Sequence, residues 1–403
     1  MLNLRKQIRT LYITGVLGNL SITGAWVTIL AARGFSLVQI GFAETIFHIT
    51  SLICEIPSGL LADIYGRKKM LVLSNLMAIV GDIVMALSGG FAIVCLSMPF
   101  HAMAYNFASG SGDALAYDSM KLCNKEAGYE RYTSNQSIIY RLANGASTLC
   151  AGVALWMGYR PAYIISALMG AVTLLVTLQL KEVHIETEDK ADNKSDNQSE
   201  KKSENKSDNQ SENKSEKKSE NKSEKETREA AERNILRELI RFFVDSILFL
   251  KKNKKASALM FLNSFVGAID ILLLFFLQSK LRTAGISNLF LGVALLTMEM
   301  GGIVGAKLIL KAKKARYYAV FIICTLGVLT GVLLEHTAII WIMVLGGFIS
   351  AMSDDAIQIR TDAKLQDMFP SEQRATLISI SSFTFSVIMI VLSPFAGYLF
   401  TIW

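Results

Sequence analysis

The sequence predicts an all-α membrane protein in which many helices cross the bilayer. The chain has 403 residues, of which 52% are hydrophobic and 19% charged, and its mean hydropathy is +0.38. Soluble domains carry about 25% charged residues. The charge is also uneven, since 37 of the 75 charged side chains lie within residues 181–255. The remaining stretches are long and poor in charge, which is typical of segments buried in lipid.

Eleven apolar stretches are long enough to span a bilayer, which takes roughly 20 residues. Six of them precede the charged central region and five follow it. In order, the expected spans are residues 11–32, 37–62, 70–90, 92–114, 134–156, 160–180, 256–279, 287–310, 317–334, 337–358 and 375–400.

The distribution of lysine and arginine predicts the orientation of these spans. With a cytoplasmic N terminus, 36 of the 41 basic residues fall in cytoplasmic segments and 4 in outer segments. Basic residues gather on the cytoplasmic side of membrane proteins. We therefore expect a multi-pass protein of the cell membrane whose N terminus and central linker are cytoplasmic. The +7 net charge is explained by this orientation and gives no reason to expect a nucleic-acid partner.

Reactive side chains occur in no pattern that indicates catalysis, a cofactor or a metal. The five cysteines are odd in number and form no CxxC or Cys/His ligand spacing. Residues 109–118 contain a glycine spacing that resembles a phosphate loop, but no strand precedes it and no Gly-Lys-Ser/Thr follows. We expect no cofactor, no metal site, no enzymatic activity and no use of ATP.

The central region separates two apolar halves. Residues 193–224 read as eight tetrads of Asn, Lys, Ser, Asp, Glu and Gln with no apolar residue, a composition that predicts disorder. Apolar side chains such as Ile235 and Leu239 then recur at helical spacing among arginines, which predicts an amphipathic helix on the inner membrane surface. The expected domains are a six-helix bundle at 1–180, a disordered cytoplasmic linker at 181–225, an amphipathic cytoplasmic helix at 226–250 and a second bundle at 251–403.

The two halves carry a weak internal duplication. A shift of 246 places Gly59 on Gly305 and Arg67 on Lys313, and a shift of 242 pairs Asp113 with Asp355. Two pseudo-symmetric helical bundles indicate a transporter with a pathway between them. The same shift puts the partner of the sixth span beyond residue 403. The second bundle is therefore expected to be about one helix short, either through truncation or with an outer C terminus.

The loop after the second span carries the most specific motif. Residues 55–69 read EIPSGLLADIYGRKK and closely resemble the loop 2–3 signature of the major facilitator superfamily. This resemblance implies two bundles with twelve spans, of which we identify eleven, and a cytoplasmic latch that opens during alternating access. Arginine in this loop can pair with a carboxylate of a neighbouring span, for which Asp113 and Asp118 are the candidates. The residues at the defining positions are Gly59, Asp63, Gly66, Arg67 and Lys68.

Together with this motif, Glu55 resembles a feature of one subgroup of the family. Its position before Pro57 is similar to a variant found in clostridial-type tetracycline efflux proteins and related drug:proton antiporters, which implies that Glu55 is a functional acid. The chain differs from many drug exporters in span four. Those exporters carry an arginine there, whereas this chain has His101 near the same depth. Span five also lacks the Gly-Pro of the exporters.

Ionisable side chains within spans are further candidates, because burying such a group is costly unless it serves a function. Glu44, His48 and Glu55 fall within an arc of about 40° at helical spacing, so they share one face. Carboxyl and imidazole groups there can carry protons. Alternatively, His48 packs, Glu44 lies in a solvated vestibule and Glu55 belongs to the latch. The residues expected to couple protons to substrate are Glu44, His48, Glu55, Asp82, Arg141, Asp270 and Glu299.

The other spans add polar and aromatic residues. A pair of Arg141 with Asp82 or Asp113 would neutralise two buried charges at once. Aromatic side chains can line a pocket for amphipathic ligands, although in membranes they more often pack or form an interface belt. The residues expected to line the pathway are Trp26, His101, Tyr105, Tyr140, Asn144 and Asn263.

These features together predict a proton-coupled secondary transporter that works as a monomer in the lipid bilayer. We expect it to export small amphipathic compounds or antibiotics by alternating access. A metabolite or sugar symporter is the alternative within transport. A membrane sensor or receptor that keeps a transporter fold without transporting is the alternative from another class.

Overall fold

The structure, a computed structural model, describes residues 2–183, scattered positions between 237 and 249, and residues 251–402 except 313 and 369–373. The side chains of several further helical residues, among them Asp63 and Arg141, also lie outside the description. All regular secondary structure in the described residues is helical. The linker expected at 181–225 lies outside the description from residue 184 on. The amphipathic helix expected at 226–250 is described only at scattered helical positions after 236.

The first half forms six segments that run back and forth through the bundle, three of which are broken into two helices. The unbroken segments are α3 (Leu37–Tyr65), α4 (Arg67–Leu87) and α9 (Tyr159–Thr177). The broken segments are α1 (Leu4–Asn19) with α2 (Trp26–Ala32), α5 (Phe91–Ala108) with α6 (Ser111–Lys121), and α7 (Tyr129–Leu149) with α8 (Ala151–Met157).

The second half contributes five unbroken helices. They are α12 (Lys254–Thr283), α13 (Asn288–Lys311), α14 (Tyr317–Leu334), α15 (Ile340–Asp367) and α16 (Arg374–Ile402). More than half of the apolar stretch of α12 and of α15 is buried (56% each), against 22% for α14. The first two helices are therefore central, whereas α14 lies at the periphery.

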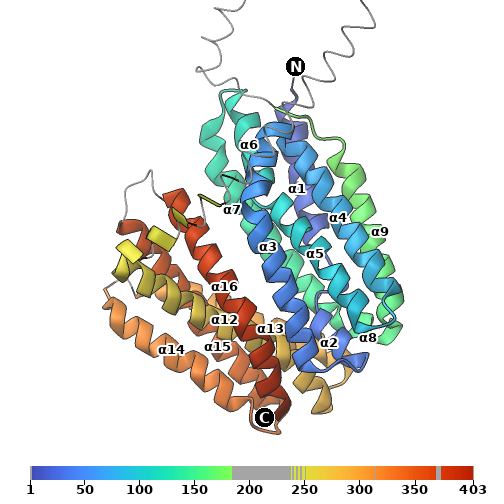
Figure 1. Cartoon of the computed structure of the whole chain (residues 1–403), viewed down its shortest axis with the longest axis vertical. Helices are drawn as coiled ribbons and strands as arrows, with labels where there is room; N and C mark the ends of the chain where they lie inside the picture. Colours follow the sequence, from blue (N-terminus) through green and yellow to red (C-terminus); the bar gives the residue numbers. More distant parts are fainter. Residues whose placement is uncertain are drawn as a thin grey trace, which may run out of the picture.

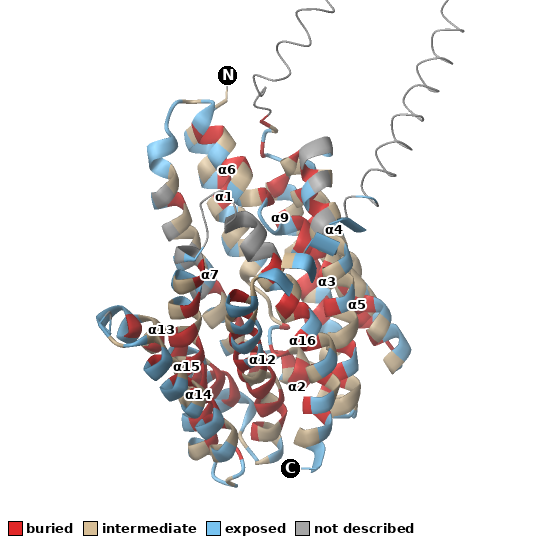
Figure 2. Cartoon of the chain, turned by 60° about the vertical axis from the view of Figure 1, so that its left-hand side comes forward, coloured by how far each residue is buried: buried red, intermediate tan, exposed pale blue. Residues whose placement is uncertain are grey.

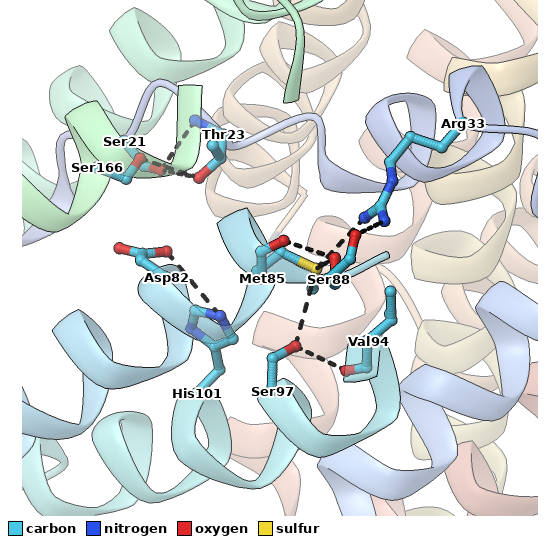
Figure 3. Close-up of polar contacts among 10 residues, drawn as sticks. All are labelled: Ser21, Thr23, Arg33, Asp82, Met85, Ser88, Val94, Ser97, His101 and Ser166. Carbon is cyan, nitrogen blue, oxygen red and sulfur yellow. Dashed lines mark hydrogen bonds and ion pairs between the residues drawn. The ribbon is translucent and has the colours of Figure 1, made fainter. Parts of the chain in front are cut away.

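The first expected span differs most from its prediction. Ten stretches of described residues are helical, long and apolar enough to cross a membrane, but residues 11–32 form no continuous helix. The chain leaves the helix after Asn19, and its polar groups bond to neighbouring helices. Ser21 N–H donates to Ser147 Oγ at 2.8 Å, and Thr23 Oγ1 lies 3.2 Å from Ser166 Oγ (Figure 3). Irregular backbone at membrane depth is tolerated where protein groups satisfy it in this way.

Local sequence explains how several helices begin and end. Ser36 caps α3 with a reciprocal capping box, in which Ser36 Oγ accepts from Gln39 N–H and Gln39 Oε1 accepts from Ser36 N–H. Gly66 then separates α3 from α4 with a φ of +101°, and Gly110 separates α5 from α6 with a φ of +71°. Glycine adopts these angles without the steric cost that a side chain brings.

The two halves pack as two bundles that meet at one end and diverge toward the other (Figure 1). We call the diverging end, which carries the N terminus, α6 and the start of α4, the basic end, because Arg5, Lys6, Arg67 and Lys68 belong to these elements. The C terminus lies at the opposite end (Figure 1). Termini at opposite ends are what an odd number of crossings requires.

The bundles touch through several helix pairs, among them α2 with α12 and α7 with α13. Two further pairs show how closely the halves approach each other. In the first pair, α3 and α16 approach so closely that a Cβ on Gly397 would collide with the carbonyl oxygen of Leu37. Thr45 Oγ1 also donates to the carbonyl oxygen of Ile390 at 3.0 Å. In the second pair, α8 meets α13, where a Cβ on Gly152 would collide with the carbonyl oxygen of Asn288. Backbone therefore lies directly against backbone where the halves close.

The outer surface of the bundles is apolar. In Figure 2 many exposed residues lie on the outward faces of the helices. They include large apolar side chains such as Trp156, Leu87 and Val391, with exposed fractions of 81%, 71% and 70%. Side chains of this kind cover the surface where a bilayer surrounds the protein.

Candidate functional site

A cavity of about 980 Å³ lies between the two halves. Its walls reach from Trp26 and Met389, deep between the bundles, to Glu55 and Asp362 near the basic end. We call it the large cavity. Its described titratable lining residues, apart from tyrosines, are three acids and two histidines, and no lysine or arginine is among its described lining residues. These titratable residues are Glu44, His48, Glu55, His101 and Asp362.

Glu44 and His48 form one acid–imidazole pair in this cavity. They lie one helical turn apart on α3, with 3.3 Å between His48 Nε2 and Glu44 Oε1. The His48 ring packs edge-on against Phe47 of its own helix and Phe385 of α16, at centroid distances of 5.5 and 5.7 Å. His48 is 8% exposed, and its Nδ1 has no hydrogen-bond partner. The shared face predicted for span two is therefore present, and His48 touches both halves.

Asp82 and His101 form a second acid–imidazole pair, between α4 and α5 (Figure 3). His101 Nε2 lies 3.9 Å from Asp82 Oδ1. The absence of a side chain at Gly81 makes room for the imidazole, since a Cβ there would lie 3.0 Å from the ring. The structure places His101 beside Asp82 and leaves the expected pairing of Arg141 with Asp82 or Asp113 untested. The Arg141 side chain lies outside the described residues.

The loop 2–3 motif is held within the first bundle. Arg67 Nε lies 3.1 Å from Asp118 Oδ2, so Asp118 is the partner among the two candidates. The Glu182 carboxylate accepts hydrogen bonds from the backbone N–H groups of Arg67 and Lys68, at 2.9 and 3.0 Å. An acid at this position caps the positive end of α4. Glu182 stands in a charged stretch after span six, so nothing in its sequence context indicated this role.

The structure gives less information about two other motif positions, Gly59 and Asp63. No atom of the described residues lies within 4 Å of a Cβ built at Gly59, so their packing does not require a glycine there in this conformation. Asp63 belongs to α3, and its side chain lies outside the described residues.

A smaller cavity of about 210 Å³ lies beside α7, between that helix and the second bundle. Asn144 of α7 lines it together with Asp270 of α12 and Glu299 of α13. Thr148 Oγ1 of α7 donates to Glu299 Oε1 at 2.9 Å, which joins the two halves. Tyr140 lines both cavities, whereas the remaining predicted lining residues, Trp26, His101, Tyr105 and Asn263, line the large one.

The sequence reasoning missed a polar stretch of α15. Asp354, Asp355, Gln358 and Asp362 all belong to this helix, and Gln358 and Asp362 line the large cavity. The span expected at 337–358 leaves Asp362 outside, and none of these four residues is among the expected site residues. The helix continues to Asp367, which places Asp354 in its middle. The pairing of Asp355 with Asp113 in the duplication was the available signal.

A helical membrane protein with two bundles around a cavity that is closed at one end has the architecture of a membrane transporter. The sequence model of the Major Facilitator Superfamily matches residues 10–394. The chain therefore belongs to the Major Facilitator Superfamily and is a transporter of that superfamily. This membership argues against an enzyme and against the non-transporting sensor that we considered.

Individual relatives agree with this placement. A segment of 86 residues is 31% identical to the uncharacterized MFS-type transporter YxaM of Bacillus subtilis (strain 168), and it spans 21% of this chain and 22% of that protein. The fold is similar to that of a mutant of the nucleoside transporter NupG, with a TM-score of 0.71, 13% identity and coverage of 98% of this chain and 91% of that one. It is also similar to a D-xylose-proton symporter, with a TM-score of 0.65, 10% identity and coverage of 97% and 89%.

Proposed function

We propose that this protein is a proton-coupled secondary transporter that exports small amphipathic compounds, neutral or cationic, by alternating access. The observation that carries the proposal is the large cavity, which combines aromatic walls with acids and histidines. Its described lining includes Trp26, Phe275 and Tyr105, and three carboxylates without a lysine or arginine. An aromatic and acidic cavity favours flat apolar ligands and cations over anions.

Two acid–imidazole pairs support coupling to protons. Glu44 with His48 and Asp82 with His101 each place a carboxylate beside an imidazole, and both kinds of group can take up and release a proton. A proton and a cationic ligand are alternative partners for the same carboxylate. Binding of one therefore favours release of the other, which is the requirement for exchange.

The cavity extends toward the side from which an exporter must take up its substrate. The large cavity extends toward the basic end, and the rule that basic residues lie inside makes this end cytoplasmic. In this conformation the protein would accept compounds from the cytoplasm of the cell membrane. Closing the basic end and opening the opposite one would release them outside.

Efflux of a fluorescent aromatic cation tests this proposal. Cells that express the protein should lose preloaded ethidium faster than control cells, and a protonophore should abolish the difference. Glu55→Gln and Asp63→Asn should each reduce efflux to the level of control cells at equal expression. Glu126→Gln, an exposed acid outside the cavity, should not. Efflux that resists the protonophore, or that persists in both variants, would contradict the assigned coupling.

A metabolite or sugar symporter is the second candidate, and the hydroxyl and amide groups of the same cavity favour it. The large cavity is lined by Ser51 and Asn106 of the first half and by Ser382 and Gln358 of the second. Such groups suit a polyhydroxylated ligand. Proton-driven uptake of labelled uridine or xylose into cells, with no effect on ethidium, would favour this candidate over the exporter.

A further inference from the structure

The junction between α13 and α14 carries a cluster of exposed bases. Lys307 and Lys311 lie one turn apart near the end of α13, and Lys314 and Arg316 follow in the connection to α14. All four side chains are exposed, and none of them forms an ion pair with a side chain in the described part of the chain. We call these four residues the junction cluster. Their charges are available to a partner from outside the bundle.

The internal duplication shows that this junction differs from its counterpart in the first half. There the side chain of Arg67 is held inside the bundle, with its Nε 3.1 Å from Asp118 Oδ2. The shift of 242 in the duplication places Asp118 on Arg360. The position of the acid that holds the first junction is therefore occupied by a base in the second, which adds positive charge beside the junction cluster.

The connection between α13 and α14 is held in a defined position by α15. Arg360 donates from Nη2 to the carbonyl oxygen of Ala315 at 2.9 Å. Lys364 Nζ lies 4.0 Å from the centroid of the Tyr317 ring, and the Tyr317 hydroxyl lies 2.9 Å from Thr361 Oγ1. Binding a ligand to bases on a fixed connection costs less conformational entropy than binding it to bases on a free loop.

Apolar side chains that face outward adjoin the cluster on both helices. Leu308 and Leu310 are exposed in the last turns of α13, the latter to 59%. Tyr318 and Ile322 are exposed in the first turns of α14, to 71% in the case of Tyr318. Apolar side chains on the outside of spanning helices contact lipid chains, and tyrosine gathers at the level of the headgroups. The junction cluster therefore lies at the headgroup level of the leaflet at the basic end.

We propose that the junction cluster binds the headgroup of an anionic phospholipid from this leaflet. The phosphate oxygens of the headgroup accept hydrogen bonds from Lys311, Lys314 and Arg316, and the acyl chains lie against the exposed apolar face of α14. The positive charge selects an anion. The adjoining apolar surface selects a lipid over a soluble anion. The site is an interaction surface, and its existence does not depend on which compound the protein transports.

A reporter tryptophan beside the cluster tests this site in the full-length protein. Tyr318→Trp is introduced after the four native tryptophans are replaced by phenylalanine. The protein is placed in phosphatidylcholine nanodiscs in which a small, equal fraction of the lipid is either brominated phosphatidylglycerol or brominated phosphatidylcholine. Bromine quenches tryptophan fluorescence at short range. The anionic lipid should quench the reporter more strongly than the neutral lipid, and equal quenching would overturn the proposal.

Two pairs of substitutions separate the site from a general attraction to the basic end. Each base beside an anionic headgroup contributes about fivefold to binding. Lys311→Gln/Lys314→Gln should therefore weaken the preference for phosphatidylglycerol by about 25-fold. Lys121→Gln/Lys125→Gln removes two exposed bases of the first half and should leave the preference unchanged. Equal losses in both variants, or no loss in the first, would overturn the site.

Two further measurements identify the partner and the basis of its binding. Sodium phosphate added at constant ionic strength should leave the quenching unchanged. Relief of quenching by phosphate would mean that the cluster binds a soluble anion, which would overturn the assignment to a lipid. Lys311→Arg/Lys314→Arg should keep the preference for phosphatidylglycerol, because it keeps both charges. Loss of the preference in this variant would show that charge is not what binds the headgroup.

Discussion

At the scale of one residue, the burial of Glu335 makes the stability of the folded protein depend on pH. This residue caps the C terminus of α14, just beyond the span, and its side chain is 1% exposed with Oε1 unpartnered. Burial raises the pKa of Glu335 to about 9 from an ordinary value of 4.5, although Lys280 nearby opposes part of the rise. The folded protein therefore keeps a proton here that the unfolded chain loses above pH 4.5.

The sign of the effect follows from linkage. The stabilisation is fully present below pH 4.5 and declines as the pH rises toward 9. We expect the Tm of the detergent-solubilised protein to fall over this window. We expect Glu335→Gln, which imitates the neutral carboxyl, to flatten the decline, because each pKa unit corresponds to about 1.4 kcal/mol. A thermal-shift series over pH measures this, with Glu126→Gln as the exposed control. Equal declines in wild type and Glu335→Gln would contradict the buried proton.

At the scale of elements, the sequence predicted helices well where hydropathy alone decides them. The span expected at 317–334 coincides with α14, a peripheral helix whose outward face is apolar. Prediction from the sequence failed where contacts between distant parts of the chain determine the structure of an element. The break after Asn19 is accompanied by hydrogen bonds to hydroxyl groups of α7 and α9, and the polar part of α15 packs against glycines of other helices, such as Gly267 and Gly302. Local patterns contain neither kind of information.

The residue pairs of the candidate site also divide into those that the sequence predicts and those that it does not. Spacing along α3 was enough to bring Glu44 and His48 together, because both lie on one helix. The pairing of Asp82 with His101 joins two different helices, and it depends on how those helices pack. A single sequence lists such residues but does not pair them.

The junction of α3 and α4 allows an element-scale prediction at Gly66. A side chain there meets two obstacles, a φ of +101° and the Glu182 carboxylate, which would lie 2.6 Å (Cδ) from a Cβ. Gly34 has a φ of +88° with open space around it, and Gly89 has open space without a positive φ. Alanine at a left-handed position costs about 1–2 kcal/mol. We expect Tm to fall most for Gly66→Ala, less for Gly34→Ala and little for Gly89→Ala. Equal losses at Gly66 and Gly34 would show that Glu182 does not hold the junction.

At the scale of the whole molecule, alternating access requires the contacts at the opposite end to form and break. Gly41 and Gly397 allow α3 and α16 to meet there, since a Cβ on Gly41 would lie 2.7 Å from Pro394 Cα and one on Gly397 would collide with the Leu37 carbonyl. Backbone atoms of packed helices cannot yield as a flexible side chain does. A methyl group at either position therefore destabilises the closed opposite end without touching the cavity that binds ligand.

We accordingly expect Gly397→Ala to shift the population toward molecules that are open at the opposite end. Spin labels on Gly89→Cys and Ala338→Cys, in exposed loops of the two halves at that end, report the separation of the bundles by pulsed electron paramagnetic resonance. The five native cysteines are first replaced in this background. Gly112→Ala is the matched control, because no atom of the described residues lies within 4 Å of a Cβ built there. The distance distribution should move to longer values in Gly397→Ala and stay unchanged in Gly112→Ala. An unchanged distribution in both would mean that the close backbone contact of α3 with α16 does not control opening.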